Sequence, residues 1–368
     1  MLKARLVEST EELSDWTQSW DDLAVLHNRP FAAPGWLLPW WRHVGSANGP
    51  ALRAVLVTSG TRLVAVFPFW VERTRTGLNH YRLMGAELCT GSEPLAEADV
   101  RAESAALAMR MLLKADPPLD VLRLEGVSSE SHWASALASA WPGRRPWLGV
   151  DRCDVAPFLS LSGRTFDDWL ATKSGNFRKE IRRRRRRLAE HGFHSKVSVD
   201  LPEVAARLPA FTRLHRARWE PRGGSDVLKS GTDEMLLDVA RAFSGTSRLQ
   251  LWTMERDEAE VISARIFLGA GTYVTSWLAG FDDEWAGFAP GFVGMVSAIE
   301  HTWSAGTYQR IDLGVGTQQF KSQFADGAEQ VEWKRAVRKG WRPLHTPAQF
   351  IPWEVRRRVS RLERTLRA

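Results

Sequence analysis

The chain contains little cysteine and lacks any long hydrophobic run. Cys89 and Cys153 are the only cysteines among 368 residues, without CxxC spacing or a clustered histidine partner. Neither a disulfide framework nor a zinc site is therefore expected. No stretch approaches the roughly 18 uncharged apolar residues of a membrane span. Glu11, Glu12 and Asp15 stand where a signal peptide would have its apolar core. We therefore expect no integral membrane segment and a protein that stays in the cytoplasm.

Several well-known sequence signatures are missing too. The chain has no hydrolase elbow of the Ser-His-Asp enzymes, no P-loop and no Rossmann fingerprint. His191 and His194 have no thiol or carboxylate pattern beside them, so we expect no bound metal. With 44% hydrophobic and 25% charged residues, the composition is that of a globular protein and excludes general disorder. The length suggests about two domains.

The positive charge is concentrated in two segments. Residues 173–191 contain nine basic and two acidic residues, a net charge of +7 that equals that of the whole chain. The C-terminal residues 354–368 add six arginines and two glutamates, and their apolar residues recur at helical spacing. The remainder of the chain is slightly acidic, so the body of the protein is not a polycation.

The first basic segment is predicted to be a helix. Ser174 suits an N-cap, and Phe177, Ile181 and Leu188 fall on one stripe. Arg182–Arg187 extend around all sides of such a helix, so most of them must face solvent. This pattern fits an ordinary solvated helix. It also fits a surface for an anionic partner such as a tRNA, a carrier protein or a phosphorylated cofactor.

The two halves of the chain show the same order of predicted elements. The first half is expected to hold a helix over 8–27, a hairpin of 52–58 and 62–72, a helix over 100–114, a strand over 120–126, a helix over 130–140 and a strand over 147–153. The second is expected to hold strands over 193–199, 248–255, 260–268, 272–279, 308–316 and 331–341, with helices over 204–219 and 290–304. Hairpin, third strand, helix and a strand ending in glycine thus recur at 52–126 and 248–316, which predicts two similarly built α+β domains.

Four short motifs in the second half carry a family resemblance. They are Leu214-His215-x-x-Arg218-Trp219, Gly280-Phe281-Asp282, Ala289-Pro290-Gly291, and Asp312-Leu313-Gly314-Val315-Gly316 followed by Phe320-Lys321. In this combination the chain resembles the CelD/BcsL-type acetyltransferases of the GNAT superfamily, and with them the FemX-type aminoacyltransferases. The resemblance covers roughly residues 30–340 in its order of elements.

The resemblance implies an α+β fold of two fused GNAT-like domains, each a mixed, mostly antiparallel sheet flanked by helices. On this basis residues 1–155 form the first domain, residues 156–345 form the second and carry the active site, and residues 346–368 form a basic helix. It also implies transfer of an acyl group from a carrier thioester, usually acyl-CoA such as acetyl-CoA, to an amine or hydroxyl. No metal is implied.

Two segments depart from the family pattern. The Gln/Arg-x-x-Gly-x-Gly/Ala loop that binds the CoA pyrophosphate has no match where Pro290-Gly291-Phe292 stands. The acidic residue and tyrosine that many relatives carry in the final motif are replaced by residues 317–320. The identity of the donor therefore stays open between acyl-CoA, aminoacyl-tRNA and a carrier protein.

The candidate donor-binding residues are Pro290, Gly291, Phe292 and Gly294. A helix N-terminus after a strand offers N–H groups and a partial positive charge to a phosphate. Proline fits the first helical turn, and glycine lets a ligand approach the backbone. The alternative is an ordinary helix start packed on the sheet.

Acyl transfer also needs groups that stabilise an oxyanion and manage the proton of the acceptor. In FemX-like enzymes the corresponding Phe-Lys pair is associated with the tetrahedral intermediate, so the resemblance implies this role for Lys321. Asp312 is a candidate to orient Lys321 or take a proton, or else to pair with an arginine. His215 is a candidate base. The candidate acceptor-binding residues are Arg218, Trp219, Asp282 and Phe320.

Three functions remain open from the sequence. The first is an acyl-CoA-dependent acyltransferase acting on a small-molecule or saccharide acceptor in a biosynthetic pathway. The second is a tRNA-dependent aminoacyltransferase that grips its tRNA with the helix of Arg182–Arg187. The third is a catalytically silent binding protein that keeps the fold. A groove beside Pro290 that is filled by side chains would favour the third.

Overall fold

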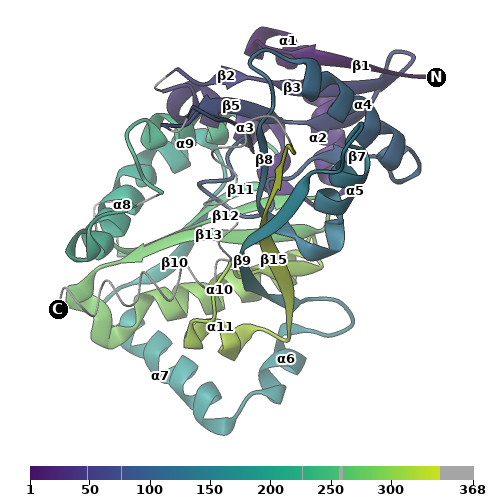
Figure 1. The fold of residues 1–368 in the computed structure, drawn as a ribbon. Coiled ribbons are helices and arrows are strands. Elements are labelled where there is room, and N and C mark those ends of the chain that lie inside the picture. Colours follow the sequence, from purple (N-terminus) through teal and green to yellow (C-terminus); the bar gives the residue numbers. More distant parts are fainter. Residues whose placement is uncertain (48, 76, 226, 257–259, 340–368) are drawn as a thin grey trace, which may run out of the picture. The chain divides into compact units, whose positions relative to one another are not determined.

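A computed structural model describes residues 1–339, except residues 48, 76, 226 and 257–259 (Figure 1). The basic helix expected over 346–368 lies outside the described residues. The chain divides into two compact units. Among the described residues, unit 1 comprises 1–23, 45–155 and 329–339, and unit 2 comprises 24–44 and 156–328.

The units are not two consecutive halves of the chain. The chain passes from one to the other at residue 155, and also near residues 24, 44 and 328. Backbone pairing explains one crossing, because strand β15 (Gly327–Val337) pairs antiparallel with β8 (Val121–Ser128) in unit 1. Side-chain packing explains another, since Gly35 of α3 (Pro34–Trp40) lies directly against Phe243 of unit 2.

Unit 1 contains two groups of hydrogen-bonded strands. One has the order β1-β3-β4-β7, and the other runs β15-β8-β6-β5-β2, in which only β6 and β8 are parallel. The new elements are β1 (Leu2–Val7), β2 (Ala51–Leu52), β3 (Ala54–Ser59), β4 (Arg62–Phe67), β5 (Phe69–Arg73), β6 (Asn79–Leu83), β7 (Leu95–Ala96), α1 (Thr10–Ser14), α4 (Arg101–Lys114) and α5 (Trp133–Ser139). Helix α2 (Thr17–Leu26) crosses the boundary at residue 23. Buried Phe67, Phe69, Leu112 and Trp133 belong to the core of this unit.

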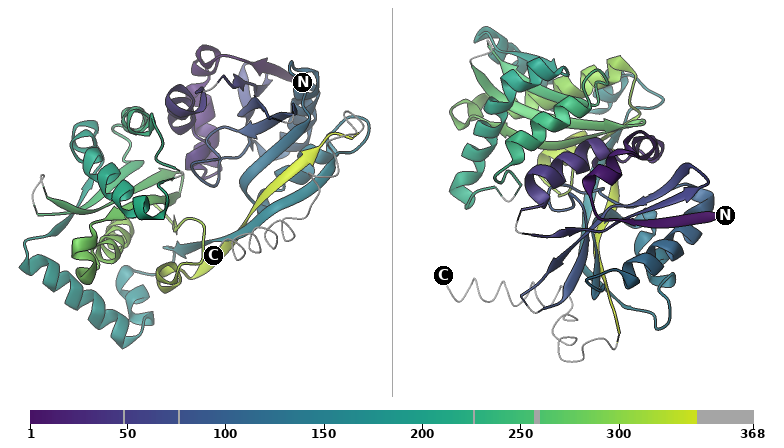
Figure 2. Two further views of the ribbon diagram at one scale, coloured as in Figure 1. Left: turned by 60° about the vertical axis from the view of Figure 1, so that its left-hand side comes forward. Right: turned by 90° about the horizontal axis from the view of Figure 1, so that it is seen from above.

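Unit 2 is a layered structure with helices on both faces of a sheet. Its strands follow the order β10-β11-β12-β13-β14-β9, and only β13 and β14 are parallel. Helix α8 (Leu201–Trp219) covers one face and α10 (Pro290–Ala305) the other (Figures 1 and 2). Strand β12 (Val261–Ala270) is buried at every position, as expected for a strand covered on both faces.

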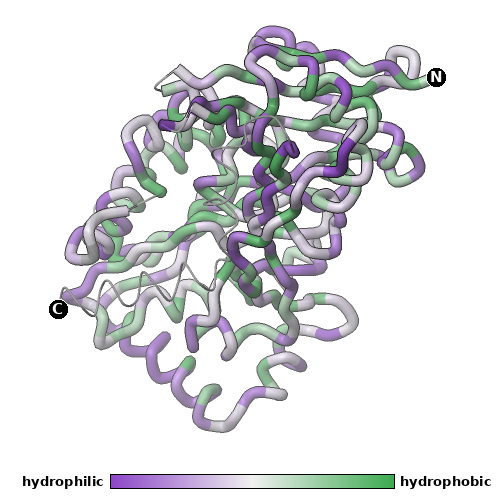
Figure 3. The backbone as a smooth tube through the Cα atoms, viewed as in Figure 1, coloured by the Kyte–Doolittle hydropathy of each residue, from purple (hydrophilic) through white to green (hydrophobic). Residues whose placement is uncertain are grey.

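The remaining elements of unit 2 complete the layers around this sheet. They are the last residues of β9 (Trp147–Ser160), β10 (His194–Ser198), β11 (Leu249–Glu255), β13 (Tyr273–Phe281), β14 (Arg310–Asp312), α6 (Phe166–Thr172), α7 (Gly175–Glu190), α9 (Thr232–Ala242) and α11 (Gln319–Phe324). Helix α7 is hydrophilic over most of its length (Figure 3), with Ile181 and Leu188 as its buried residues. Its apolar stripe and its Ser174 cap are those that the sequence predicts.

The predicted fold class is confirmed: both units are mixed, mostly antiparallel sheets flanked by helices. In unit 1 the hairpin β5–β6 is followed by α4 and by β8, parallel to β6. In unit 2 the hairpin β12–β13 is followed by α10 and by β14, parallel to β13. The repeat therefore exists, but the matching hairpin of unit 1 is β5–β6 rather than the predicted pair of strands over 52–72. The predicted hairpin does form, as the antiparallel pair β3–β4. Its second strand, predicted over 62–72, is interrupted at Pro68, where the chain passes from β4 in one group of strands to β5 in the other.

Candidate active site

A pocket of about 610 Å³ lies in unit 2 where two parallel strands separate. β13 and β14 pair only from Tyr273 with Arg310 to Thr275 with Asp312. Beyond this point, residues 276–281 of β13 and residues 313–315 both line the pocket. A β-bulge places Trp277 and Leu278 opposite the single residue Ile266 of β12. Such a bulge bends a strand, and here it accompanies the opening between the strands.

A lysine ammonium lies in the part of the pocket that is lined by Gly314, Val315 and Lys321, which we call the closed end because Lys321 is nearly buried there. Lys321 is 8% exposed, and its Nζ donates to the carbonyl oxygens of Gly314 at 2.9 Å and Val315 at 2.7 Å. Gly314 has φ +73°, and a Cβ added there would lie 3.3 Å from the carbonyl oxygen of Ser276 and 3.7 Å from Nζ. The glycine thus lets the two strands and the ammonium come together at one point.

The start of α10 forms another wall, contributed by Pro290, Gly291 and Phe292. The helix begins at Pro290, as the sequence predicts, after Ala289 in the left-handed conformation with φ 51°. No side chain of the described residues caps this end. Pro290 has no N–H, and the N–H of Phe292 donates to the carbonyl oxygen of Ala289 at 3.0 Å. Among the described residues, the N–H of Gly291 is therefore the donor of the first turn that remains for a ligand. Gly294 is not among the residues that line the pocket, although open space surrounds the position of an added Cβ.

The C-terminal end of α8 supplies His215, Arg218 and Trp219. His215 is buried, with Nδ1 3.3 Å from the carbonyl oxygen of Ala279 and Nε2 3.0 Å from Oγ of Ser225. A carbonyl only accepts, so Nδ1 carries the hydrogen and Nε2 accepts from the serine hydroxyl. Burial lowers the pKa of His215, and the nearby arginines 218 and 216 lower it further. The imidazole is therefore neutral near pH 7.

The structure gathers most of the sequence-predicted site residues in this one pocket. Those that line it are Lys321, His215, Pro290, Gly291, Phe292, Arg218, Trp219 and Phe320. Asp312 lies outside the lining, with its Oδ1 2.6 Å from Nε of Arg310, which is the arginine pairing that the sequence left open. Asp282 also lies outside, where it accepts from the N–H of Glu284 at 3.0 Å and caps a short 3-10 helix.

Sequence reasoning missed one charged wall residue, Arg265 of β12. It is 8% exposed, lines the pocket and donates to Oγ of Ser276 and to the carbonyl oxygen of Gly291. The signal was present in the sequence, because Arg265 is the single charged residue in the otherwise apolar run of β12. A charged residue within a strand buried on both faces is rare without a reason.

The basic helix α7 contacts the segment that begins α10. The guanidinium of Arg184 lies 5.1 Å from the ring centre of Phe292, and that of Arg187 lies 4.3 Å from the ring centre of Phe288. Several arginines of the helix form ion pairs, and Arg184 is one of them, because it also pairs with Glu180. Arg183 pairs with Glu180, and Arg185 pairs with Glu300. Part of the positive charge is thus neutralised locally, and part stands beside the pocket wall.

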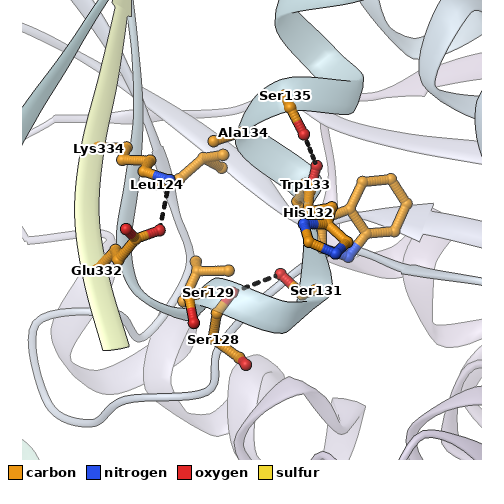
Figure 4. A pocket seen from close by; sticks show the side chains of 11 residues that line it. Leu124, Ser128, Ser129, Ser131, His132, Trp133, Ala134, Ser135, Glu332 and Lys334 are labelled. Atoms are coloured by element: carbon orange, nitrogen blue, oxygen red, sulfur yellow. Dashed lines mark hydrogen bonds and ion pairs between the residues drawn. The ribbon is translucent and has the colours of Figure 1, made fainter. Parts of the chain in front are cut away.

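Unit 1 holds a second cavity of about 40 Å³, far below the usual size of a substrate site (Figure 4). Its polar groups are paired close by: Lys334 forms an ion pair with Glu332, and the hydroxyls of Ser131 and Ser135 donate to carbonyl oxygens of their own turns.

In the part of the chain that the structure describes, no cluster of three or more His, Cys, Asp or Glu side chains suits a metal ion. The described helices also include none with the length and apolarity to cross a membrane.

Comparison with known proteins agrees with this geometry. Residues 175–322 match the family model described as an acetyltransferase (GNAT) domain. The structure of FemX has a TM-score of 0.57 and 10% identity, covering 91% of this chain and 96% of FemX. The C-terminal domain (DUF2156) of a candidate lysylphosphatidylglycerol synthetase from Agrobacterium fabrum has a TM-score of 0.54 and 12% identity, covering 88% of this chain and 92% of that domain. A tandem GNAT protein from the clavulanic acid biosynthesis pathway has a TM-score of 0.42 and 13% identity, covering 91% of this chain and 98% of that protein. Among curated proteins, none matches the sequence significantly.

The matched segment contains every residue that lines the large pocket, from His215 to Lys321. The likeness to FemX extends over 91% of the chain, so both units share that fold. Residues 175–322 of unit 2 therefore resemble a GNAT acetyltransferase domain, and the pocket between β13 and β14 lies inside this matched segment.

Proposed function

We propose that the protein is an acyltransferase of the CelD/BcsL type that moves an acyl group, most simply acetyl, from acyl-CoA to an amine or hydroxyl of a small-molecule or saccharide acceptor. The observation that carries the proposal is the pairing of two features in one pocket. These are the uncapped start of α10 and the ammonium of Lys321 at the closed end. Acyl-CoA thioesters are formed and used in the cytoplasm, and the proposal places the reaction there.

The residues present fit a phosphate-bearing thioester as donor. The first turn of α10 offers the N–H of Gly291 and the partial positive charge of the helix start to phosphate oxygens. The walls beyond it are largely apolar, with Trp277, Phe281 and Phe292 among them, as a pantetheine arm requires. A volume of about 610 Å³ falls within the range of small-molecule sites.

Lys321 is assigned the stabilisation of the oxyanion. The transition state of acyl transfer develops negative charge on the former carbonyl oxygen, and a preorganised cation favours that state over the neutral ground state. The two carbonyl acceptors on Gly314 and Val315 fix the direction of the ammonium before a substrate arrives. Fixed orientation avoids the reorganisation that water would need.

His215 is assigned the removal of the acceptor proton. Its neutral imidazole is able to take a proton near pH 7, and Nε2 already accepts from the hydroxyl of Ser225. An acceptor amine or hydroxyl would reach this nitrogen in place of Ser225 or through its hydroxyl. Arg218, Trp219 and Phe320 would then form the acceptor side of the pocket.

A tRNA-dependent aminoacyltransferase is the second candidate. It is favoured by the arginines of α7 that contact Phe288 and Phe292 beside the pocket, and by the FemX-like fold. A carrier protein would use the same basic surface. A catalytically silent binding protein is less well supported, because side chains do not fill the space beside Pro290.

The test is incubation of the protein with a panel of acyl-CoAs and pooled amines or sugars, with released CoA measured by a thiol reagent. We expect acyl-CoA-dependent release and a fall in kcat of about 100- to 1,000-fold in Lys321→Ala. Lys179→Ala, on the exposed side of α7, serves as the control and should keep wild-type activity. Activity that is abolished by ribonuclease and requires aminoacyl-tRNA would replace this proposal with the second candidate.

A further inference from the structure

Three arginines are buried among the described residues, namely Arg207, Arg335 and Arg265. Arg207 binds Glu255 through two hydrogen bonds of 2.8 and 2.9 Å. Arg335 lies 2.8 Å from Asp151. Arg265 differs, because its partners are all neutral: Oγ of Ser276 at 3.3 Å, Sδ of Met295 at 3.3 Å and the carbonyl oxygen of Gly291 at 3.0 Å.

Packing and hydrogen bonding do not account for a cation at this position. Neutral acceptors orient a guanidinium, but they do not offset the loss of hydration as a carboxylate does. The burial of Arg265, with a smaller contribution from the charge of Arg218, lowers its pKa to about 10. A methionine would fill similar space in this apolar strand without burying a charge. The protein therefore carries a charge without a counter-charge in the wall of this pocket.

A hydrogen bond to Ser276 connects this charge with the part of the pocket that holds Lys321. Its partner Ser276 is the first residue of β13 beyond the pairing with β14. The carbonyl oxygen of the same Ser276 lies 3.3 Å from the Cβ position of Gly314, which is itself 3.7 Å from Nζ of Lys321. Arg265 thus contacts Ser276 directly, and Ser276 lies beside Gly314, whose carbonyl oxygen accepts from Lys321. The described residues that line the pocket include no aspartate or glutamate.

We infer that the pocket binds a carboxylate group of its substrate and that Arg265 is the residue that binds it. The planar fork of a guanidinium matches a carboxylate through two parallel hydrogen bonds. The carboxylate would share the pocket with the reacting carbonyl, because Arg265 and Lys321 both line it. Its source is either the acyl group that is transferred or an acceptor such as an amino acid. The inference rests on the proposed function only in calling this ligand a substrate.

The first experiment tests the site without any thioester. Thermal unfolding of the full chain is followed with succinate and with its uncharged analogue succinamide. We expect stabilisation by succinate only, and loss of this stabilisation in Arg265→Met. Without ligand, Arg265→Met should unfold at the same temperature as the wild type or higher, since a buried charge without a counter-charge is removed. Arg207→Met is the matched control: it should unfold at a lower temperature, because Glu255 then stays buried without its counter-charge.

The second experiment identifies the source of the carboxylate. Binding of succinyl-CoA and butyryl-CoA is compared by calorimetry, and acetyl-CoA turnover is compared with pools of amino acids and of amino-acid amides. The carboxylate compound should be favoured in one of these comparisons by about 10- to 100-fold, and Arg265→Met should remove that preference. A donor carboxylate changes the first comparison, and an acceptor carboxylate changes the second.

The inference is overturned if neither comparison favours the carboxylate while the CoA esters still bind, a result that leaves the proposed acyltransferase intact. It is also overturned if Arg265→Met lowers the unfolding temperature as much as Arg207→Met and keeps the preference for the carboxylate. If no CoA ester binds, the proposed function fails, and the difference between succinate and succinamide alone decides whether Arg265 binds a carboxylate.

Discussion

The two units contain the same local arrangement with opposite outcomes. β6 and β8 are parallel over three residue pairs, as are β13 and β14. Each second strand leads to a glycine with positive φ, +69° at Gly126 and +73° at Gly314. In unit 1 the chain itself covers this place, because the N–H of Gly91 donates to the carbonyl oxygen of Gly126 at 2.8 Å and Thr90 packs on it. In unit 2 the same place opens into the pocket.

The comparison shows that the architecture shared by the two units is not enough to form a ligand site. A hairpin, a crossover helix and a parallel strand are enough to make the strands separate, and both units have them. The two units differ in the segment that follows β6 in unit 1 and β13 in unit 2, and this segment decides whether a ligand site forms. In unit 1 that segment returns over the strand ends, and Ser92 donates to the carbonyl oxygen of Met84 to hold it there. In unit 2 the chain turns into α10 and leaves the separation open.

The largest effect is expected from alanine at the two corresponding glycines. At Gly126 an added Cβ would lie 3.0 Å from Thr90, so Gly126→Ala combines a clash with a left-handed backbone. We expect it to lower the free energy of unfolding by about 2–4 kcal/mol. Gly314→Ala should cost only about 1–2 kcal/mol for the backbone. Its methyl group, however, occupies the closed end of the pocket and should lower kcat/KM by about 10- to 100-fold.

Urea unfolding and CoA release measure the two quantities separately. The comparison predicts that stability is the main loss at Gly126 and activity the main loss at Gly314. Equal losses of activity at unchanged stability would show that the place in unit 1 also serves the reaction, and the distinction between the units would be wrong.

The histidines offer a pH test of the same comparison. Burial, with the charges of Arg123, Arg82 and Arg335, lowers the pKa of His80 in unit 1 from 6.5 to about 4. Between pH 6.5 and about 4, the unfolded chain therefore binds a proton at His80 that the folded chain does not bind. Stability is therefore lost as the pH falls from 6.5 to about 4, by up to about 3 kcal/mol. His80→Gln should remove this part of the pH dependence.

Unfolding by urea at a series of pH values gives the difference between wild type and His80→Gln. His215 in unit 2 also has a lowered pKa, but its nitrogens have hydrogen-bond partners in the pocket. His215→Gln should therefore lower activity at every pH, whereas His80→Gln should leave the pH profile of kcat unchanged. A shift of that profile in His80→Gln would contradict a purely structural role for unit 1.

The smallest effect is expected at the rim of the open site. Phe320 is 39% exposed and lines the pocket. Phe320→Ala should raise KM about 3- to 10-fold, because part of the apolar surface that covers a ligand is lost. The unfolding temperature should change little, since Phe320 is not part of the buried core of either unit. Steady-state kinetics with thermal unfolding measures both, and a lower kcat at unchanged KM would contradict a role in binding alone.

The strongly periodic elements were predicted well from the sequence. The hairpin β11–β12, the start of α10 at Pro290 and the capped helix α7 follow from apolar periodicity, proline chemistry and Ser174. β1 and β6 were missed because they are short and polar at alternate positions. Helix α9 was missed too, although its apolar residues recur at helical spacing.

The site was predictable only as far as local motifs reach. Lys321, His215 and the start of α10 come from separate elements, and the resemblance to a family brought them together before the structure did. Asp312 shows the limit: its carboxylate is next to Arg310 in the same strand, and no local pattern tells a pair from a catalytic acid. Arg265 was passed over because a single charge in an apolar run has no spacing from which to infer a partner.

The interleaving of the two units has a consequence for synthesis. Strand β8 receives its antiparallel partner β15 from residues 331–337, close to the end of the described chain. When the first 155 residues have been synthesised, β15 has not yet been made. The edge of β8 that β15 covers in the folded protein is therefore still exposed. An exposed strand edge invites pairing with other chains. Expression of residues 1–155 alone should accordingly give an aggregation-prone fragment, and helper chaperones would be needed until translation passes β15.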